Sequence, residues 1–184
     1  MKRQNLMTVL IFALMAVQVQ PQERPEFSKL KPEAQVLVLG WLNGNCGADE
    51  QGKFEQQLKD LGAVLEPVFW EAYRLGPTRQ ELRSDTAAAV KRYADRQSWL
   101  RQFGEAQMGR QETERQLAIP EKQYVDREVR QYVERYKTAA LAGLGLIGTR
   151  QSEAELARIA DDKNNRAQTA AKESLKSIRQ RNRR

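Results

Sequence analysis

Apolar residues between positions 48 and 178 recur at intervals of three and four, with polar and charged residues filling the positions between them. This period places the apolar side chains on one face of an α-helix. Glycine interrupts the pattern after most stretches, as expected where helices end. The apolar stripes predict helices that cover, in order, residues 54–61, 64–73, 82–103, 124–144, 154–160 and 167–178.

Local signals place several helix ends. Thr78 and Glu81 are three residues apart before an apolar stripe, and Ser152 and Glu155 have the same spacing. In such a capping box, each side chain satisfies a free backbone N–H group at the start of the helix. Both pairs are therefore predicted to begin helices. Gly104 follows the long third stripe and is predicted to end that helix.

Two segments are harder to assign. The run VLVLGWL, residues 36–42, is apolar throughout and fits a strand or a helix, although Pro32 followed by Glu33 favours a helix start. Residues 105–116 hold only Ala106 and Met108 as apolar contacts, so any helix there is expected to be weakly attached. The predicted fold class is all-α, either a short α-solenoid of helix pairs or an irregular helical bundle.

Residues 143–148 read GLGLIG, which has the GxGxxG spacing of a dinucleotide-binding loop. That loop requires a strand to enter it, so that the following helix points its N-terminus at the phosphates. The segment entering this one is instead an amphipathic helix that begins after Ile119-Pro120. We therefore predict that Gly143 and Gly145 allow close helix packing and that Gly148 ends the helix.

Parts of the chain resemble a known repeat family. An apolar residue precedes glycine at positions 62, 104 and 148, so the intervals between these glycines are 42 and 44 residues. A period of about 40–47 residues is typical of helix-pair solenoids. DLGAVLEPVFWEAYRLG, residues 60–76, is similar to the turn and second helix of a bacterial HEAT repeat, and residues 140–178 resemble the same family at greater length. The resemblance implies a curved stack of helix pairs that binds partner proteins and carries no catalytic residues. Residues 105–116 depart from it, and the irregular bundle stays open.

The amino terminus has the composition of an export signal. Lys2 and Arg3 precede an apolar run over residues 6–17, which is too short to cross a bilayer comfortably as a helix. We expect residues 1–20 to be a signal peptide of a periplasmic or secreted protein, with a membrane anchor formed by residues 6–17 as the alternative. The remaining chain divides into a linker with a short apolar segment (21–47), a helical repeat domain (48–178) and a basic tail (179–184).

The formal net charge of +7 lies at the two ends, because residues 4–171 hold 23 positive and 23 negative side chains. Clustered guanidinium groups beyond the last apolar stripe can bind phosphate or carboxylate. The tail is therefore a candidate site for an anionic surface, such as lipid head groups, lipopolysaccharide or nucleic acid. Its candidate contacts are Arg179, Arg181, Arg183 and Arg184.

The residue types argue against catalysis. The chain has no histidine and one cysteine, Cys46, which removes histidine-based general bases and an intramolecular disulfide. Glu112 and Glu114 are two residues apart, as are Glu153 and Glu155, so neither acidic pair converges on a helix. The aromatic residues Trp41, Trp70 and Trp99 are expected to lie in the core or to anchor helices to one another. We therefore predict a non-catalytic exported scaffold or adaptor that needs no cofactor or metal and acts by contact with another protein, with anionic-ligand binding by the tail as the alternative.

Overall fold

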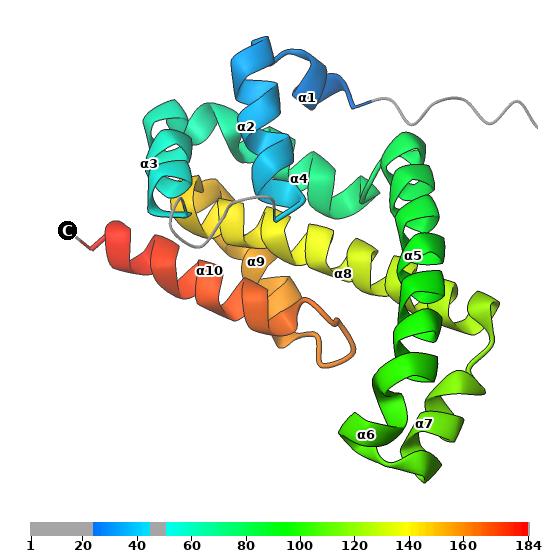
Figure 1. The fold of residues 1–184 in the computed structure, drawn as a ribbon. Helices are drawn as coiled ribbons and strands as arrows, with labels where there is room; N and C mark the ends of the chain where they lie inside the picture. Colours follow the sequence, from blue (N-terminus) through cyan, green and yellow to red (C-terminus); the bar gives the residue numbers. More distant parts are fainter. Residues whose placement is uncertain (1–23, 45–50, 184) are drawn as a thin grey trace, which may run out of the picture.

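The computed structural model describes residues 24–44 and 51–183, and every regular element in these ranges is helical (Figure 1). The all-α prediction is confirmed for this part of the chain. The expected signal or anchor segment, Cys46 and Arg184 lie outside the described residues. The elements are α1 (Pro25–Ser28), α2 (Pro32–Leu42), α3 (Gln51–Leu61), η1 (Gly62–Leu65), α4 (Glu66–Leu75), α5 (Arg79–Trp99), η2 (Leu100–Gly104), α6 (Glu105–Met108), α7 (Arg110–Leu117), α8 (Glu121–Ile147), η3 (Arg150–Ser152), α9 (Glu153–Asp161) and α10 (Gln168–Arg181).

Helix α8 is the centre of the fold. It is 27 residues long and packs against α2, α3, α4, α5 and α10, so helices from both ends of the described chain meet on it (Figure 1). Its carboxyl-terminal half supplies Ala140, Leu141 and Leu144 to the main core, where all three are fully buried. Phe69 of α4, which precedes α8 in the chain, and Ile178 of α10, which follows it, belong to the same core. We call the elements around this core the body.

The GLGLIG glycines lie inside α8 and allow two helices to approach it. A Cβ atom built on Gly143 would lie 2.6 Å from the ring of Phe69, and one on Gly145 would lie 2.9 Å from the Ser174 hydroxyl. Real side chains do not tolerate such distances, so α4 and α10 can pack this closely only because both positions lack a Cβ. Helix α8 ends at Ile147, directly before Gly148. The predicted packing role of the first two glycines is confirmed.

The segment before α3 is part of the body. Residues 21–47 were expected to form a linker with a short apolar segment, but Val38 and Leu42 of α2 are buried in the main core. The preceding turn is also fixed, because both carboxylate oxygens of Glu71 accept backbone N–H groups, from Glu26 at 3.0 Å and from Phe27 at 2.9 Å. These N–H groups lie in the first turn of α1, where a helix has no carbonyl of its own to accept them, and the Glu71 carboxylate satisfies both. The core therefore extends to both sides of the expected boundary at residue 48.

The long hairpin between α4 and α8 leaves the body. Helix α5 packs on the start of α8 through a small cluster of Ala89, Tyr124 and Val125. Beyond it, residues 95–118 form an arm of the end of α5, the π-helical turn η2, and helices α6 and α7 (Figure 1). Gly104 does not end the helix as predicted. It lies within the helical run, buried against Thr113, and the run ends at Gly109, whose φ is +81°.

Most of the other predicted helix ends are present. Gly62 follows α3 with a φ of +65°, and Thr78 forms the complete capping box with Glu81. The second predicted box is wrong, because the Ser152 side chain makes no cap hydrogen bond to α9. Its hydroxyl bonds instead to Glu66, which is 86 positions earlier in the chain. A long-range buried acceptor has replaced the local one.

Candidate functional site

Two of the four arginines expected in a free basic tail, Arg179 and Arg181, make contacts within the fold. Helix α10 continues through Arg181, so the expected boundary at residue 179 falls inside a helix. Arg179 lies 3.6 Å from the Glu153 carboxylate, measured from Nε to Oε2. Arg183 is exposed beyond the end of the helix. The structure therefore does not present these side chains as one free cluster.

Arg181 closes the carboxyl-terminal end of α8. Its guanidinium donates hydrogen bonds to the carbonyl oxygens of Gly145 and of Gly148, the latter at 2.8 Å. The last carbonyls of a helix have no partner within the helix, and a cation beside them also interacts favourably with the helix dipole. Burial lowers the pKa of Arg181. We infer that this predicted ligand contact has a structural role.

The buried carboxylates of the body are also held in structural contacts. Glu66 accepts the Ser152 hydroxyl and, at 3.1 Å, the backbone N–H of Thr149, while the Trp70 indole donates to the Ser152 hydroxyl at 2.9 Å. This network ties α4 to the start of α9. Among residues 24–44 and 51–183, no group of three or more acidic or cysteine side chains is arranged to hold a metal ion.

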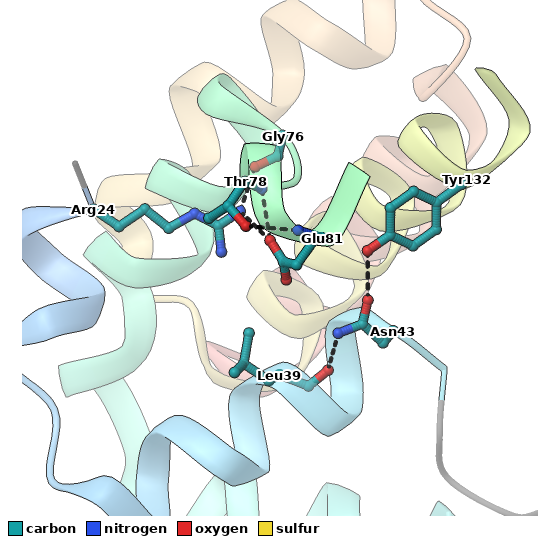
Figure 2. Close-up of polar contacts among 7 residues, drawn as sticks. All are labelled: Arg24, Leu39, Asn43, Gly76, Thr78, Glu81 and Tyr132. Carbon is teal, nitrogen blue, oxygen red and sulfur yellow. Dashed lines mark hydrogen bonds and ion pairs between the residues drawn. The ribbon is translucent and has the colours of Figure 1, made fainter. Parts of the chain in front are cut away.

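A second polar network joins the first described residue to the start of α5. Figure 2 shows the Arg24 guanidinium directed at the Gly76 carbonyl and at Glu81, whose Oε2 lies 3.2 Å away. The same Glu81 oxygen accepts the backbone N–H of Thr78, 2.6 Å away, as part of the capping box. Arg24 also lies over the ring of Tyr136, 5.3 Å from its centroid. Arg24 is buried, so these contacts fix the entry of the chain into the body.

A hollow with a mainly apolar lining runs along one face of α8, and we call it the α8 groove. Its volume is about 680 Å³, within the usual range of about 300–1,000 Å³ for ligand-binding clefts. The carboxyl-terminal end of α2 and Arg166, in the turn before α10, both contribute to its lining. The groove is lined by Trp41, Leu42, Asn43, Gly44, Gln131, Tyr132, Glu134, Arg135, Tyr136, Thr138, Ala139, Ala142 and Arg166.

Hydrogen bonds hold the aromatic walls of the α8 groove in place. The Trp41 indole donates to the Ala139 carbonyl at 2.8 Å, and the Tyr132 hydroxyl donates to the Asn43 side-chain oxygen at 2.7 Å. Asn43 is itself fixed, because its amide nitrogen donates to the Leu39 carbonyl at 2.9 Å (Figure 2). Burial, with a smaller effect of nearby acidic side chains, raises the pKa of Tyr132 to about 12. Tyr132 is therefore a neutral donor at physiological pH.

The tip of the arm exposes three large apolar side chains. Trp99 is 44% exposed, Phe103 51% and Met108 37%. The two aromatic rings contact each other, with centroids 6.4 Å apart. The arm has little apolar filling, because its buried side chains are Leu100 and the polar residues Gln97 and Thr113. This outward aromatic pair is the clearest unpartnered surface in the described chain.

The sequence placed Phe103 on the apolar stripe of residues 82–103 and predicted that Trp99 anchors helices to one another, but both side chains are exposed. The helical period showed that the apolar residues of 82–103 share one face of a helix, but it could not show which part of that face packs against other helices. A usable signal was present in the polar segment 105–116, which has too few apolar side chains to cover two aromatic rings. An aromatic pair opposite a polar helix indicates exposure.

No family model, no curated protein and no solved structure matches this chain. Within the described ranges, no helix has both the length and the apolar character needed to cross a membrane. Function is therefore inferred from the chain's own geometry. The exposed tip of the arm and the α8 groove are two candidate binding surfaces.

Proposed function

We propose that this protein is an exported, non-catalytic helical scaffold or adaptor, and that the tip of its arm is a docking surface for another protein. The observation that carries this proposal is the contact pair Trp99 and Phe103, exposed at the end of an arm that projects from the body (Figure 1). Tryptophan is enriched among the residues that dominate binding energy at protein interfaces. Contiguous exposed apolar side chains at such a position are typical of interaction sites.

Burial of the tip would provide a useful driving force. Fully burying an exposed large apolar side chain contributes about 1.5–3 kcal/mol. The tip side chains are 37–51% exposed, so each would contribute part of that on binding. Arg101 and Glu105 are exposed and lie within two residues of the aromatic pair in the sequence, so they would contribute to the rim of an interface. The buried carboxylates and arginines of the body take part in intramolecular contacts, which supports a role without catalysis.

The packing around α8 supports the irregular-bundle form of the predicted fold. In a solenoid each helix pair contacts only its neighbours along the chain. Here α4 packs directly on α8, although α5, α6 and α7 lie between them in sequence. The HEAT resemblance stays a prediction, and the proposed contact function does not depend on it.

Photo-crosslinking in the producing cell tests the proposed function. A photoreactive amino acid would replace Gln102, an exposed residue between Trp99 and Phe103 in the sequence. We expect a discrete crosslinked product that contains a second protein, identified by mass spectrometry. The matched control places the same amino acid at Lys172, an exposed position on α10.

The proposal requires the product at Gln102 to disappear when Trp99 and Phe103 are both replaced by serine, while the far-UV circular dichroism spectrum stays helical. Equal crosslinking from Gln102 and Lys172 would contradict it. The anionic-ligand alternative makes a separate prediction, namely that replacing Arg183 and Arg184 by glutamine abolishes retention on anionic vesicles at low salt. Unchanged retention would overturn that alternative.

A further inference from the structure

Helix α10 presents a row of basic side chains to solvent. Lys172, Lys176 and Arg179 are exposed and are spaced by four and three residues, which places them on one face of the helix. Asn182, directly after α10, keeps right-handed helical backbone angles, so Arg183 continues the same register. The row spans about 16 Å along the helix axis. We call these four basic residues the α10 face.

Three of the four cations have no partner within the described part of the protein. Arg179 lies beside the Glu153 carboxylate, which offsets its charge. Lys172, Lys176 and Arg183 make no ion pair with any residue of the ranges 24–44 and 51–183. Their positive charges are therefore available to an anionic partner.

The surroundings of the α10 face do not cancel this charge. Residues 172–183 hold five basic side chains and one acidic side chain, Glu173. Residues 150–171, which contain α9 and the turn before α10, hold four basic and four acidic side chains, and residues 4–149 hold nineteen of each. The charge excess between residues 4 and 183 therefore comes from α10 and its end. Such an asymmetry turns this side of the molecule toward an anionic surface.

We propose that the α10 face docks the protein on a membrane surface that contains anionic phospholipids. This inference rests on the proposed export, because an exported chain is released beside a lipid bilayer. Helix α10 packs on α8 and α9 and lies on the outside of the body (Figure 1), so its basic row can lie flat on a planar surface. It has no aromatic side chain on which the bases of a nucleic acid could stack. These features favour lipid head groups as the occupant.

The proposed membrane contact is separate from the tip of the arm. Figure 1 shows α10 and the tip at different ends of the molecule, so a bilayer and a partner protein can be bound at the same time. It also differs from binding by a free tail, because Lys172 and Lys176 lie within the folded helix.

Vesicle co-sedimentation tests the proposal with the full chain. One set of vesicles contains phosphatidylcholine with phosphatidylglycerol, and the reference set contains phosphatidylcholine alone, which reports any binding by the apolar run of residues 6–17. We expect stronger binding to the anionic vesicles, and we expect the difference to shrink as salt is added, because salt screens exposed charges. Equal binding to both sets would overturn the proposal.

Matched variants locate the contact. Each basic side chain near an anionic bilayer strengthens binding about fivefold, so K172Q combined with K176Q should weaken it about 25-fold. R83Q combined with K91Q removes the same charge from exposed positions of α5 and should change binding little. E173Q should strengthen binding, because it removes the acidic residue beside the row. Circular dichroism checks that each variant stays helical.

The variants also give the results that would contradict the proposal. Equal losses in the two double variants would show attraction by net charge alone. No loss on replacing Lys172 and Lys176 would leave only the tail arginines as lipid contacts. If a duplex oligonucleotide at equal phosphate concentration displaces the protein from the vesicles, the occupant is nucleic acid and the membrane proposal is wrong. None of these results changes the crosslinking expected at Gln102, so the two proposals are tested separately.

Discussion

The body and the arm are both helical, but they bury very different side chains. The body surrounds α8 with fully buried large residues, including Phe69, Leu144 and Tyr136. Between α5, η2 and α7, the arm has Leu100 beside Gln97 and Thr113, and the Gln97 amide nitrogen is buried with no partner among the described residues. The arm's aromatic side chains point outward instead.

This difference separates two uses of apolar residues. In the body they stabilise the fold, and some of the buried polar atoms among them are hydrogen-bonded, as in the contact from Trp70 to Ser152. In the arm, Trp99 and Phe103 contribute little to the fold, so their aromatic surface is available to a partner. Elements with few buried apolar contacts open at lower free energy than the core. We expect the arm to open locally while the body stays folded.

The largest expected effect comes from leucine truncations in the two regions. Leu144 and Leu100 are similarly buried. L144A should lower the free energy of unfolding by about 2–5 kcal/mol, as for other buried leucines. L100A should leave global unfolding nearly unchanged and accelerate amide hydrogen exchange in residues 105–117. Equal losses of global stability in chemical denaturation would contradict the separation of body and arm.

A smaller effect is expected from adding one methyl group inside the body. G143A would force the Cβ against the ring of Phe69 and should destabilise by about 1–3 kcal/mol, as for other overpacked cores. G52A is the control, because nothing lies within 4 Å of the Cβ position there. It should stabilise α3 by about 0.5–1 kcal/mol. Thermal unfolding would measure both, and a neutral G143A would show that α4 and α8 are less closely packed.

The smallest effect concerns the carboxyl-terminal arginines. R181A should cost about 1 kcal/mol, because it removes two hydrogen bonds to the end of α8. R183A should not change stability, since Arg183 is exposed beyond α10. Chemical denaturation separates the two variants. Equal stability would assign Arg181 to the solvated tail that the sequence suggested.

Local signals predicted much of the helical framework. Gly62 ends a helix with a positive φ, Thr78 caps one, and Gly143 allows close packing, because each role depends on the residue type and its immediate neighbours. Long-range contacts were not predictable in this way. Ser152 bonds to Glu66, and Arg181 reaches back to α8, across tens of residues.

The candidate sites were less predictable than the fold. The α8 groove brings Trp41 together with residues about 90–100 positions later, and periodicity cannot reveal such a meeting. The exposed Phe103 was assigned to an inward stripe because a period identifies a face but not its neighbour. Only the polar composition of residues 105–116 indicated that the face carrying Phe103 has no apolar neighbour to cover it.

The most direct test of the docking surface compares radical footprinting of the purified protein with that of the protein in its producing cell. We predict that Trp99, Phe103 and Met108 are labelled readily when purified and are protected in the cell. Leu61 and Leu75, which are 37% and 42% exposed on the body, should be labelled equally in both states. Unprotected labelling of the arm tip in the cell would contradict the proposal that a partner covers it.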